Sequence, residues 1–193
     1  MNDKLNYIAI DFETANKLTC SACSVGLIRF ENGVETDSVC HLIKPAVMYF
    51  VPEWTRDIHH ISYEDVADQP CFPEVWQNLV QPFLDKTPDF PLVAHNASFD
   101  MGVIKGCCER FDMELPNIRY FDSLYISRRT WPELKCHKLT FLGSNFGIDY
   151  LAHDALEDSR TCGLIIKLAS EKWGADTVEQ LLCACNSHLQ VLS

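Results

Sequence analysis

The stretch Tyr-Ile-Ala-Ile-Asp-Phe-Glu-Thr at residues 7–14 decides the fold of this chain. Its β-branched and aromatic residues predict a buried strand that ends in two carboxylates, Asp11 and Glu13. Side chains two positions apart on a strand point to the same face, so these carboxylates project together. Two like charges this close are costly unless a cation lies between them, and carboxylate oxygens suit Mg²⁺ or Mn²⁺. A strand that runs into an acidic surface loop is the alternative interpretation.

Two further strands follow directly. Residues 22–31 predict a second strand, and Asn32-Gly33 is a strong hairpin-turn signal. Residues 34–43 then predict a returning third strand that ends before Pro45. The first part of the chain is therefore expected to form an antiparallel three-strand meander that begins with the acidic strand.

The rest of the chain alternates helical patterns with two short strands. Ser62 with Asp65 indicates a helix start, and a loop is expected over 45–61. The patterns predict strands over about 92–95 and 117–121, and helices over about 62–68, 73–84, 99–111, 122–129, 138–145, 154–172 and 176–189. This order predicts an α/β fold with a mixed sheet flanked by helices on both faces.

Length and composition are those of a single globular domain over residues 1–193. The chain is 47% hydrophobic and 22% charged, which is ordinary for a soluble protein. We expect the motif-bearing core over about 7–170 and a helical tail over about 174–193. No apolar run approaches the roughly 18 residues of a membrane span, and no secretory segment is evident at the N-terminus. A cytoplasmic protein without membrane contact is therefore expected.

Charge and cysteine content narrow the function classes. A net charge of −11 argues against a protein that coats long stretches of nucleic acid, but it allows an enzyme that holds a few nucleotides through metal ions. Cys20 and Cys23 form a C-x-x-C without a second pair, which supports a zinc site poorly. The ten cysteines are expected to be free thiols, most of them packed in the core.

Two later stretches add acidic residues. Asn96-Ala97-Ser98-Phe99-Asp100 places Asp100 in the first turn of a helix after a buried strand, where compensation of the helix dipole is the alternative role. His153-Asp154-Ala155-Leu156-Glu157-Asp158 places His153 and Asp158 at the start of the long helix. A solvated acidic helix terminus is the alternative there.

In combination, these motifs resemble the DEDDh family of 3′–5′ exonucleases. The pattern is Asp11-x-Glu13, then Asn96-x-x-Phe99-Asp100, then His153 with four residues before Asp158, and the resemblance covers about residues 7–170. The stretches 21–26, 93–100 and 153–158 are most similar to DnaQ-like proteins such as the proofreading ε subunit of bacterial DNA polymerase III. The resemblance implies a ribonuclease H-like fold.

The resemblance also implies a metal site and its roles. Asp11, Glu13, Asp100 and Asp158 would surround two divalent ions, Mg²⁺ or Mn²⁺, with Asp11 bridging both. Glu13 and Asp158 would complete the site of the water-activating ion, and Asp100 would hold the other. Phosphodiester hydrolysis needs an activated water and a stabilised leaving oxygen, and two ions serve both ends. His153 is the candidate general base, since an ordinary histidine pKa of about 6.5 suits that task.

Candidate substrate contacts follow from the same resemblance. Thr14, His59, Asn96 and Phe99 are expected near the 3′-terminal nucleotide. His60 stands where relatives often have glycine, which leaves open whether His59 or His60 faces the substrate. A structural role for His59, an orienting role for Asn96 and a core position for Phe99 are the alternatives.

Three neighbouring features have simpler interpretations. His95 is expected to be structural, and Phe12 should pack on the face opposite the two carboxylates. The basic residues Arg128, Arg129, Lys135 and Lys138 are compatible with phosphate contacts, but also with solvated helix ends.

The expected function is metal-dependent 3′–5′ exonuclease activity on DNA 3′ ends, with single-stranded DNA the first choice of substrate and nucleoside 5′-monophosphates as products. An exoribonuclease on short RNA or RNA 3′ ends is the alternative within this chemistry. A binding subunit of a polymerase or repair complex is the alternative outside it. The apolar stripe of the tail at residues 178–189 either docks to such a partner or packs on its own domain.

Overall fold

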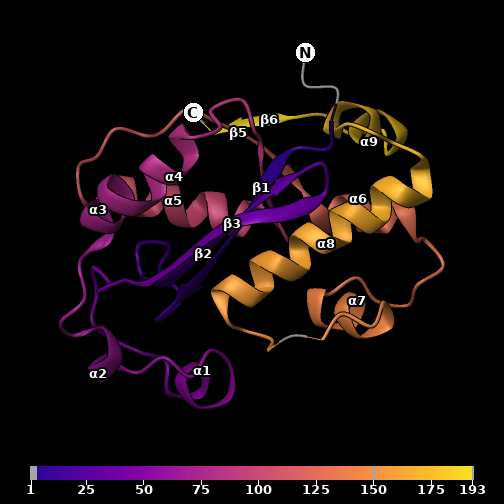
Figure 1. Ribbon diagram of the computed structural model, residues 1–193. Coiled ribbons are helices and arrows are strands. Elements are labelled where there is room, and N and C mark those ends of the chain that lie inside the picture. The colour runs from indigo at the N-terminus through magenta and orange to yellow at the C-terminus, as the bar shows by residue number, and fades with distance from the viewer. Residues whose placement is uncertain (1–3, 150, 193) are drawn as a thin grey trace.

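The structure, a computed structural model, describes residues 4–149 and 151–192 and is built around one mixed sheet (Figure 1). The strand order is β3-β2-β1-β4-β5-β6. The strands are β1 (Tyr7–Thr14), β2 (Ala22–Glu31), β3 (Val34–Leu42), β4 (Leu92–Ala94), β5 (Ile118–Asp122) and β6 (Gln190–Leu192). β1, β2 and β3 are antiparallel neighbours, whereas β4 and β5 run parallel to β1. The predicted meander and mixed sheet are therefore confirmed.

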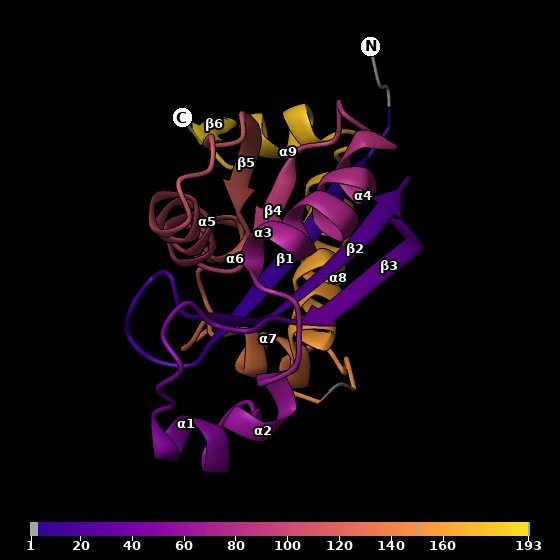
Figure 2. The same ribbon diagram turned by 90° about the vertical axis from the view of Figure 1, so that its left-hand side faces the viewer.

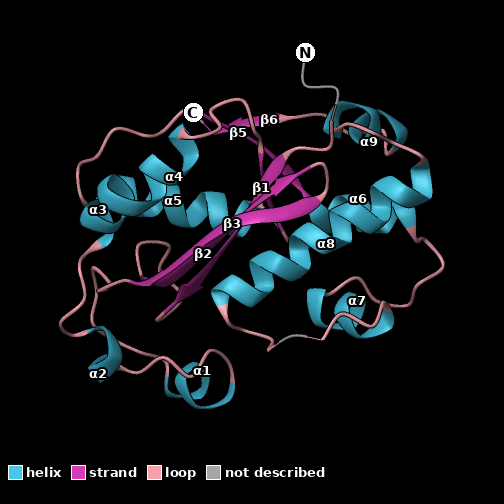
Figure 3. Cartoon of the chain, viewed as in Figure 1, coloured by secondary structure: helices cyan, strands magenta, loops and turns pink. Residues whose placement is uncertain are grey.

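Helices occupy most of the remaining chain (Figure 3). They are α1 (Pro52–Asp57), α2 (Tyr63–Val66), α3 (Phe72–Val75), the π-helical turn η1 (Trp76–Val80), α4 (Gln81–Asp85), α5 (Ser98–Arg110), α6 (Ser123–Thr130), α7 (Leu139–Asn145), α8 (Ala155–Trp173) and α9 (Val178–Ala184). Asn32 and Gly33 both have positive φ, 55° and 70°, as the predicted two-residue hairpin turn requires. Ser62 caps α2 reciprocally with Asp65, which confirms that helix start.

Three local predictions need correction. The expected loop over 45–61 contains α1. The expected helix over 73–84 is divided by η1, where the Gln81 N–H donates to the Trp76 carbonyl, five residues back. Pro82 explains this wide turn, because a proline inside a helix lacks an N–H and crowds the preceding turn. The last expected helix ends early at Ala184, and β6 follows it and pairs with β5.

The two faces of β1 belong to two different cores. Ile8, Ile10 and Phe12 pack with residues of η1, α4 and α5. Tyr7 and Ala9 pack with residues of α6, α8 and α9. Figure 2 shows α8 on the far side of the sheet and α3 and α4 on the near side. By strand alternation Asp11 and Glu13 continue the row of Tyr7 and Ala9, on the α8 side.

The C-terminal tail belongs to the second core. Val178, Leu181, Leu182 and Cys185 are buried there, and Leu189 is half-buried against them. The apolar stripe of α9 thus packs on its own chain rather than forming an open docking face. Among the described residues, no helix combines the length and the apolar character that a bilayer span requires.

The cysteines only partly follow expectation. All ten are free thiols. Five are buried, namely Cys23, Cys107, Cys108, Cys162 and Cys185. Cys40 and Cys183 are exposed, so core packing is wrong for these two.

Gly26 sets the distance between α8 and the sheet. A Cβ at this position would lie 2.3 Å from the Ala155 carbonyl oxygen and 2.5 Å from the Leu156 nitrogen. The Ser159 hydroxyl donates to the Gly26 carbonyl at 2.9 Å. Gly26 is also the β2 residue paired with Asp11. The first turn of α8 therefore lies on the sheet backbone directly beside the acidic end of β1.

We expect Gly26→Ala to lower the free energy of unfolding by about 1–3 kcal/mol, because the new methyl group must push α8 away from β2. Gly102→Ala is the matched control, since its Cβ would meet only Thr19 Cγ2 at an ordinary 3.9 Å. Urea unfolding of both variants measures the difference. Equal stability of the two variants would show that the contact between α8 and β2 is not tight.

The single-domain boundary 1–193 remains a prediction that truncation can test. Removing residues after 173 deletes α9 and β6 and uncovers Ile165 and Ile166, which are buried in the shared core. We expect the shortened chain to lose its cooperative thermal transition, while the exposed-site variant Cys183→Ser keeps it. A shortened chain with the same transition temperature as the full chain would make the tail a separate unit.

Candidate active site

Four carboxylates from three separate segments converge at the end of β1. Asp11 and Glu13 are half-buried on β1. Asp100, in the first turn of α5, is only 1% exposed, and Asp158 in α8 is 8% exposed. Asp100 and Asp158 both act electrostatically on Asp11 and Glu13. The structure thus brings together the four acids that the sequence singled out.

Backbone hydrogen bonds hold the two more buried acids in place. The N–H of Phe12, which lies between the two β1 carboxylates, donates to Asp100 Oδ1 at 3.1 Å. The Phe12 ring is 2% exposed and packs on the opposite face, as predicted. The start of α5 is therefore fixed to β1 at the point where Asp11 and Glu13 project.

The left-handed backbone conformation of His153 helps to hold Asp158 in place. His153 has φ 66°, and its N–H donates to Asp158 Oδ2 at 3.1 Å. Asp154 caps α8 by accepting from the Leu156 and Glu157 N–H groups at 3.0 and 3.1 Å. No role was predicted for Asp154, although an aspartate just before a helical pattern is a recognised N-cap signal.

Burial and mutual repulsion raise the pKa values of all four acids. Burial is the larger cause for each of them. The pKa of Asp11 lies well above its ordinary range, and those of Glu13 and Asp100 are raised to about 8. The pKa of Asp158 is raised to about 7 despite the His153 N–H that favours its charged form. Without a cation, the site therefore holds protons at neutral pH that isolated carboxylates would have released.

The residues fit a divalent cation. Asp158 Oδ1 is buried and has no hydrogen-bond partner, so one of its lone pairs is free for a ligand. Glu13, His153 and Asp158 each offer a ligand atom, and these atoms lie within 4.8 Å of one another. Carboxylate oxygens are the donors that Mg²⁺ and Mn²⁺ prefer. A bound cation would also relieve the repulsion among the acids.

Three histidines near this site differ in exposure and in hydrogen bonding. The side chain of His153 is exposed, and burial first and nearby His60 second lower its pKa. His59 is buried, its Nδ1 accepts the Ile61 N–H at 3.0 Å, and its Nε2 is buried without a partner. Burial lowers the pKa of His59 as well. His60 is exposed and left-handed, with φ 59°.

The other predicted contacts lie at the edges of the site. Thr14 is buried at the end of β1. Asn96 is exposed with φ 71°, and its N–H donates to Asp122 Oδ1 at 3.1 Å. Phe99 is 45% exposed, so the alternative of a core position is wrong. The reason is helix geometry, since the first turn of α5 points Asp100 and Met101 inward and leaves Phe99 outside.

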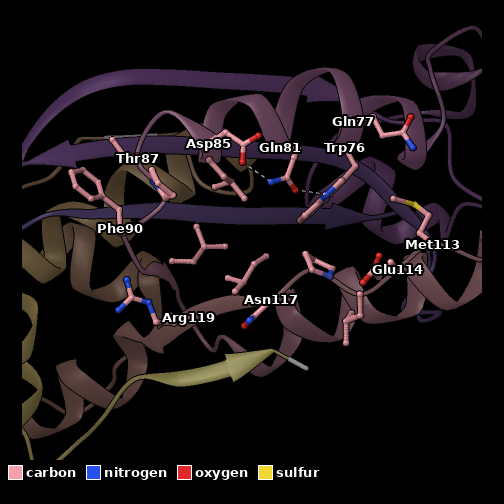
Figure 4. A pocket seen from close by; sticks show the side chains of 16 residues that line it. Trp76, Gln77, Gln81, Asp85, Thr87, Phe90, Met113, Glu114, Asn117 and Arg119 are labelled. Atoms are coloured by element: carbon pink, nitrogen blue, oxygen red, sulfur yellow. Dashed lines mark hydrogen bonds between the residues drawn. The ribbon is translucent and has the colours of Figure 1, made fainter.

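Two cavities lie at different places on the sheet. One of about 770 Å³ lies between η1, α4 and the region of β5 and includes Trp76, Gln81 and Arg119 (Figure 4). It contains none of the predicted site residues. A second cavity of about 660 Å³ includes Asn96, His153 and Asp158. Of the catalytic candidates, His153 and Asp158 therefore line the second cavity.

A family comparison agrees with this arrangement. The exonuclease family model RNase_T matches residues 8–166. The chain belongs to this exonuclease family. Among relatives, a DNA polymerase III PolC-type protein of Latilactobacillus sakei is 36% identical over 186 residues, which are 93% of this chain and 12% of that protein. The 3′-5′ exonuclease DinG of Bacillus subtilis is 27% identical over 174 residues, 88% of this chain and 18% of that protein. The chain thus spans less than a fifth of the length of these curated relatives.

Solved structures share the fold. Exonuclease X, in a complex with 5′ overhanging duplex DNA, aligns over 93% of this chain and 99% of its own, with 22% identity and a TM-score of 0.73. The nuclease domain of 3′hExo, a DEDDh family member bound to rAMP, aligns over 96% of both chains, with 15% identity and a TM-score of 0.73. These matches confirm the ribonuclease H-like fold expected from the sequence.

Glu13→Gln should stabilise the metal-free protein at alkaline pH. Because the folded-state pKa of Glu13 is raised to about 8, the folded state holds a proton that the unfolded state loses near pH 4.5. The wild type therefore loses stability relative to the variant as pH rises from about 4.5 to 8. We expect a difference on the order of 1 kcal/mol at pH 8.5 and little at pH 4, reduced by the partial exposure of the site.

Urea unfolding in EDTA at both pH values measures this difference. Exposed Glu109 makes no recorded hydrogen bond or ion pair among the described residues, so Glu109→Gln is the control and should show no such pH trend. If the difference in unfolding free energy between Glu13→Gln and the wild type were the same at both pH values, the pKa of Glu13 would not be raised in the folded protein.

Proposed function

We propose that the chain is a metal-dependent 3′–5′ exonuclease that acts on DNA 3′ ends and releases nucleoside 5′-monophosphates. The observation that carries this proposal is the cluster of four raised-pKa carboxylates in which Asp158 keeps one buried oxygen unpartnered. A member of an exonuclease family with such a cluster needs cations, and phosphodiester hydrolysis gives them a task.

Each acid has a proposed role. Asp11, Glu13, Asp100 and Asp158 would hold two divalent ions, Mg²⁺ or Mn²⁺, with Asp11 shared between them. When bound, such ions supply a nucleophile at neutral pH and stabilise the leaving oxygen. His153 accepts the proton of the attacking water as general base. Its lowered pKa supports this role, because the imidazole is then neutral and ready to accept at pH 7.

The terminal nucleotide would lie against Thr14, His59, Asn96 and Phe99. Since His59 Nδ1 accepts a backbone N–H, its Nε2 carries the proton and is a donor without a partner. Burial lowers the pKa of His59 and the Thr14 backbone partly offsets this, so His59 lies beside another predicted substrate contact, which favours it over the exposed His60. The exposed ring of Phe99, next in sequence to Asp100, offers a face on which a base can stack.

DNA is the preferred substrate in this proposal because relatives include DNA polymerase III proteins of the PolC type. Those relatives also support a polymerase or repair complex as a partner. A cytoplasmic location is part of the proposal and is supported by ten free thiols. The complete set of acids favours a catalytic role over a purely binding one.

Two matched substrates test the activity. Single-stranded DNA and RNA of identical sequence, labelled at the 5′ end, are incubated with Mg²⁺, Mn²⁺ or EDTA. We expect a ladder that shortens from the 3′ end on DNA with either cation and no cleavage in EDTA. Faster cleavage of RNA would make the protein an exoribonuclease. No ladder on either strand from folded protein would favour the binding-subunit alternative.

Single variants test the assigned residues. Asp158→Asn should reduce cleavage at least about a hundredfold, since it removes a charge that holds the cation. His153→Gln should reduce kcat about 10²- to 10⁴-fold, the usual contribution of a general base. Glu109→Gln is the control and should retain wild-type kcat and KM on the same DNA strand. Full activity in the Asp158 variant would show that the site is wrongly assigned.

A further inference from the structure

The second cavity has a basic wall that the four-carboxylate site does not explain. Its lining includes Asn96, His153 and Asp158 together with Arg128, Lys135 and Lys138. The basic residues come from the end of α6 and from the connection to α7. With a volume of about 660 Å³ it lies in the range of about 300–1,000 Å³ typical of ligand sites. We call the part lined by Arg128, Lys135 and Lys138 the basic groove.

The charge of the basic groove is unusual for this chain. The net charge is −11, yet four of the 16 lysines and arginines lie within residues 128–138. In the part of the chain that the structure describes, the ion pairs use Arg29, Arg56, Lys86, Arg160 and Lys172. None of these pairs includes a residue of the basic groove, whose three side chains are exposed. Three cations without an ion pair among the described residues therefore line the same cavity as Asp158.

A series of buried and half-buried hydrogen bonds fixes this wall. The Cys162 thiol donates to Ser123 Oγ at 3.2 Å, and the Ser123 hydroxyl donates to His95 Nδ1 at 2.8 Å. His95 Nε2 donates to the His137 carbonyl at 2.8 Å, and His137 Nε2 donates to the Trp131 carbonyl at 2.9 Å. The acceptors fix the ring tautomers, because a carbonyl cannot donate. His95 is thus structural, as predicted, and it ties the segment that carries Lys135 and Lys138 to the end of β4.

We propose that the basic groove binds the phosphodiester backbone of the substrate strand on the 5′ side of the scissile bond. This inference rests on the proposed function. A strand whose 3′ end reaches His153 and Asp158 must continue away from them, and the basic groove shares one cavity with both residues. Lysine and arginine contacts to phosphates position a strand without reading its sequence, which suits an enzyme that removes successive nucleotides.

Arg128 and Lys138 are the residues that we expect to contribute most. Arg128 can contact a phosphate through two parallel N–H groups. Lys138 lies just before α7, and its side chain has no recorded partner among the described residues. The ammonium group of Lys135 lies 5.6 Å from the centre of the Phe141 ring, which restrains it near the wall.

The test is binding of a 5′-fluorescein-labelled twelve-residue oligothymidylate, measured by anisotropy with Ca²⁺ in place of Mg²⁺ to slow hydrolysis. The variant combines Arg128→Gln, Lys135→Gln and Lys138→Gln. We expect its Kd to rise at least about tenfold at 50 mM NaCl. The slope of log Kd against log salt should fall by about 2, since three single-strand phosphate contacts are lost. Lys105 is exposed on α5 and lies outside the cavity, so Lys105→Gln should change neither quantity.

Kinetics separate this inference from the proposed function. In Mg²⁺ the triple variant should raise KM on the twelve-residue strand far more than on the p-nitrophenyl ester of thymidine 5′-monophosphate, which has no upstream strand. A variant that combines Arg128→Lys, Lys135→Arg and Lys138→Arg should restore the wild-type KM. Equal thermal transition temperatures of the wild type and the triple glutamine variant exclude misfolding. If the wild type hydrolyses neither substrate but binds the strand through the basic groove, only the proposed function fails.

A wild-type Kd in the triple variant, within the change seen for Lys105→Gln, would overturn the inference. The inference would also be overturned if the wild type bound a fluorescent oligoglutamate peptide and the triple variant lost this binding but still bound the DNA strand. That outcome would assign the basic groove to an acidic protein partner.

Discussion

The close contact between the first turn of α8 and the backbone of β2 at Gly26 is the constraint on which the site depends. Gly26 is the residue paired with Asp11, so the helix meets the sheet at the acidic end of β1. Ser159 holds this contact from the helix side through the Gly26 carbonyl. Asp158 immediately precedes Ser159, so the same contact places Asp158 beside the acidic end of β1. Because glycine has no side chain, Gly26 lets α8 approach the sheet closely and so sets the distance between Asp11 and Asp158.

Placing four carboxylates together in a buried site is electrostatically unfavourable. Burial and repulsion raise the pKa values of all four acids, so without a cation the site retains protons at neutral pH and full ionisation of the four acids is unfavourable. Hydrogen bonds from the Phe12 and His153 N–H groups offset part of this cost, and both come from backbone that the fold has already fixed. Such a rigid carboxylate cluster is suited to a cation, which would replace the bound protons with little reorganisation of the side chains.

Much of this arrangement was predictable from local sequence patterns. The β-branched and aromatic run at residues 7–14 predicted the strand, and the period of a strand predicted the shared face of Asp11 and Glu13. Asn32-Gly33 predicted the hairpin. The three-residue β6 was not predictable, since so short a segment has no periodicity and becomes a strand only by pairing with β5. Nor was the exposure of Phe99, which depends on how α5 is turned against the sheet. The hydrogen bonds from Cys162 through His95 to His137 join segments that are distant in sequence, so no local pattern reports them.

Local charge, rather than net charge, decides how this acidic chain can meet a polyanion. Elsewhere in the described structure some bases are neutralised directly by acids, as Arg29 and Lys86 are by Asp37. Beside the site this pairing is absent, and Arg128, Lys135 and Lys138 remain available on a wall anchored by His95. Screening limits the reach of charge to about 8 Å at physiological salt, so a phosphate in the basic groove is affected mainly by these cations and less by distant acids. The acidic cluster and the basic groove then have complementary tasks, since the first holds the cations that act on one phosphate and the second holds the strand that supplies it.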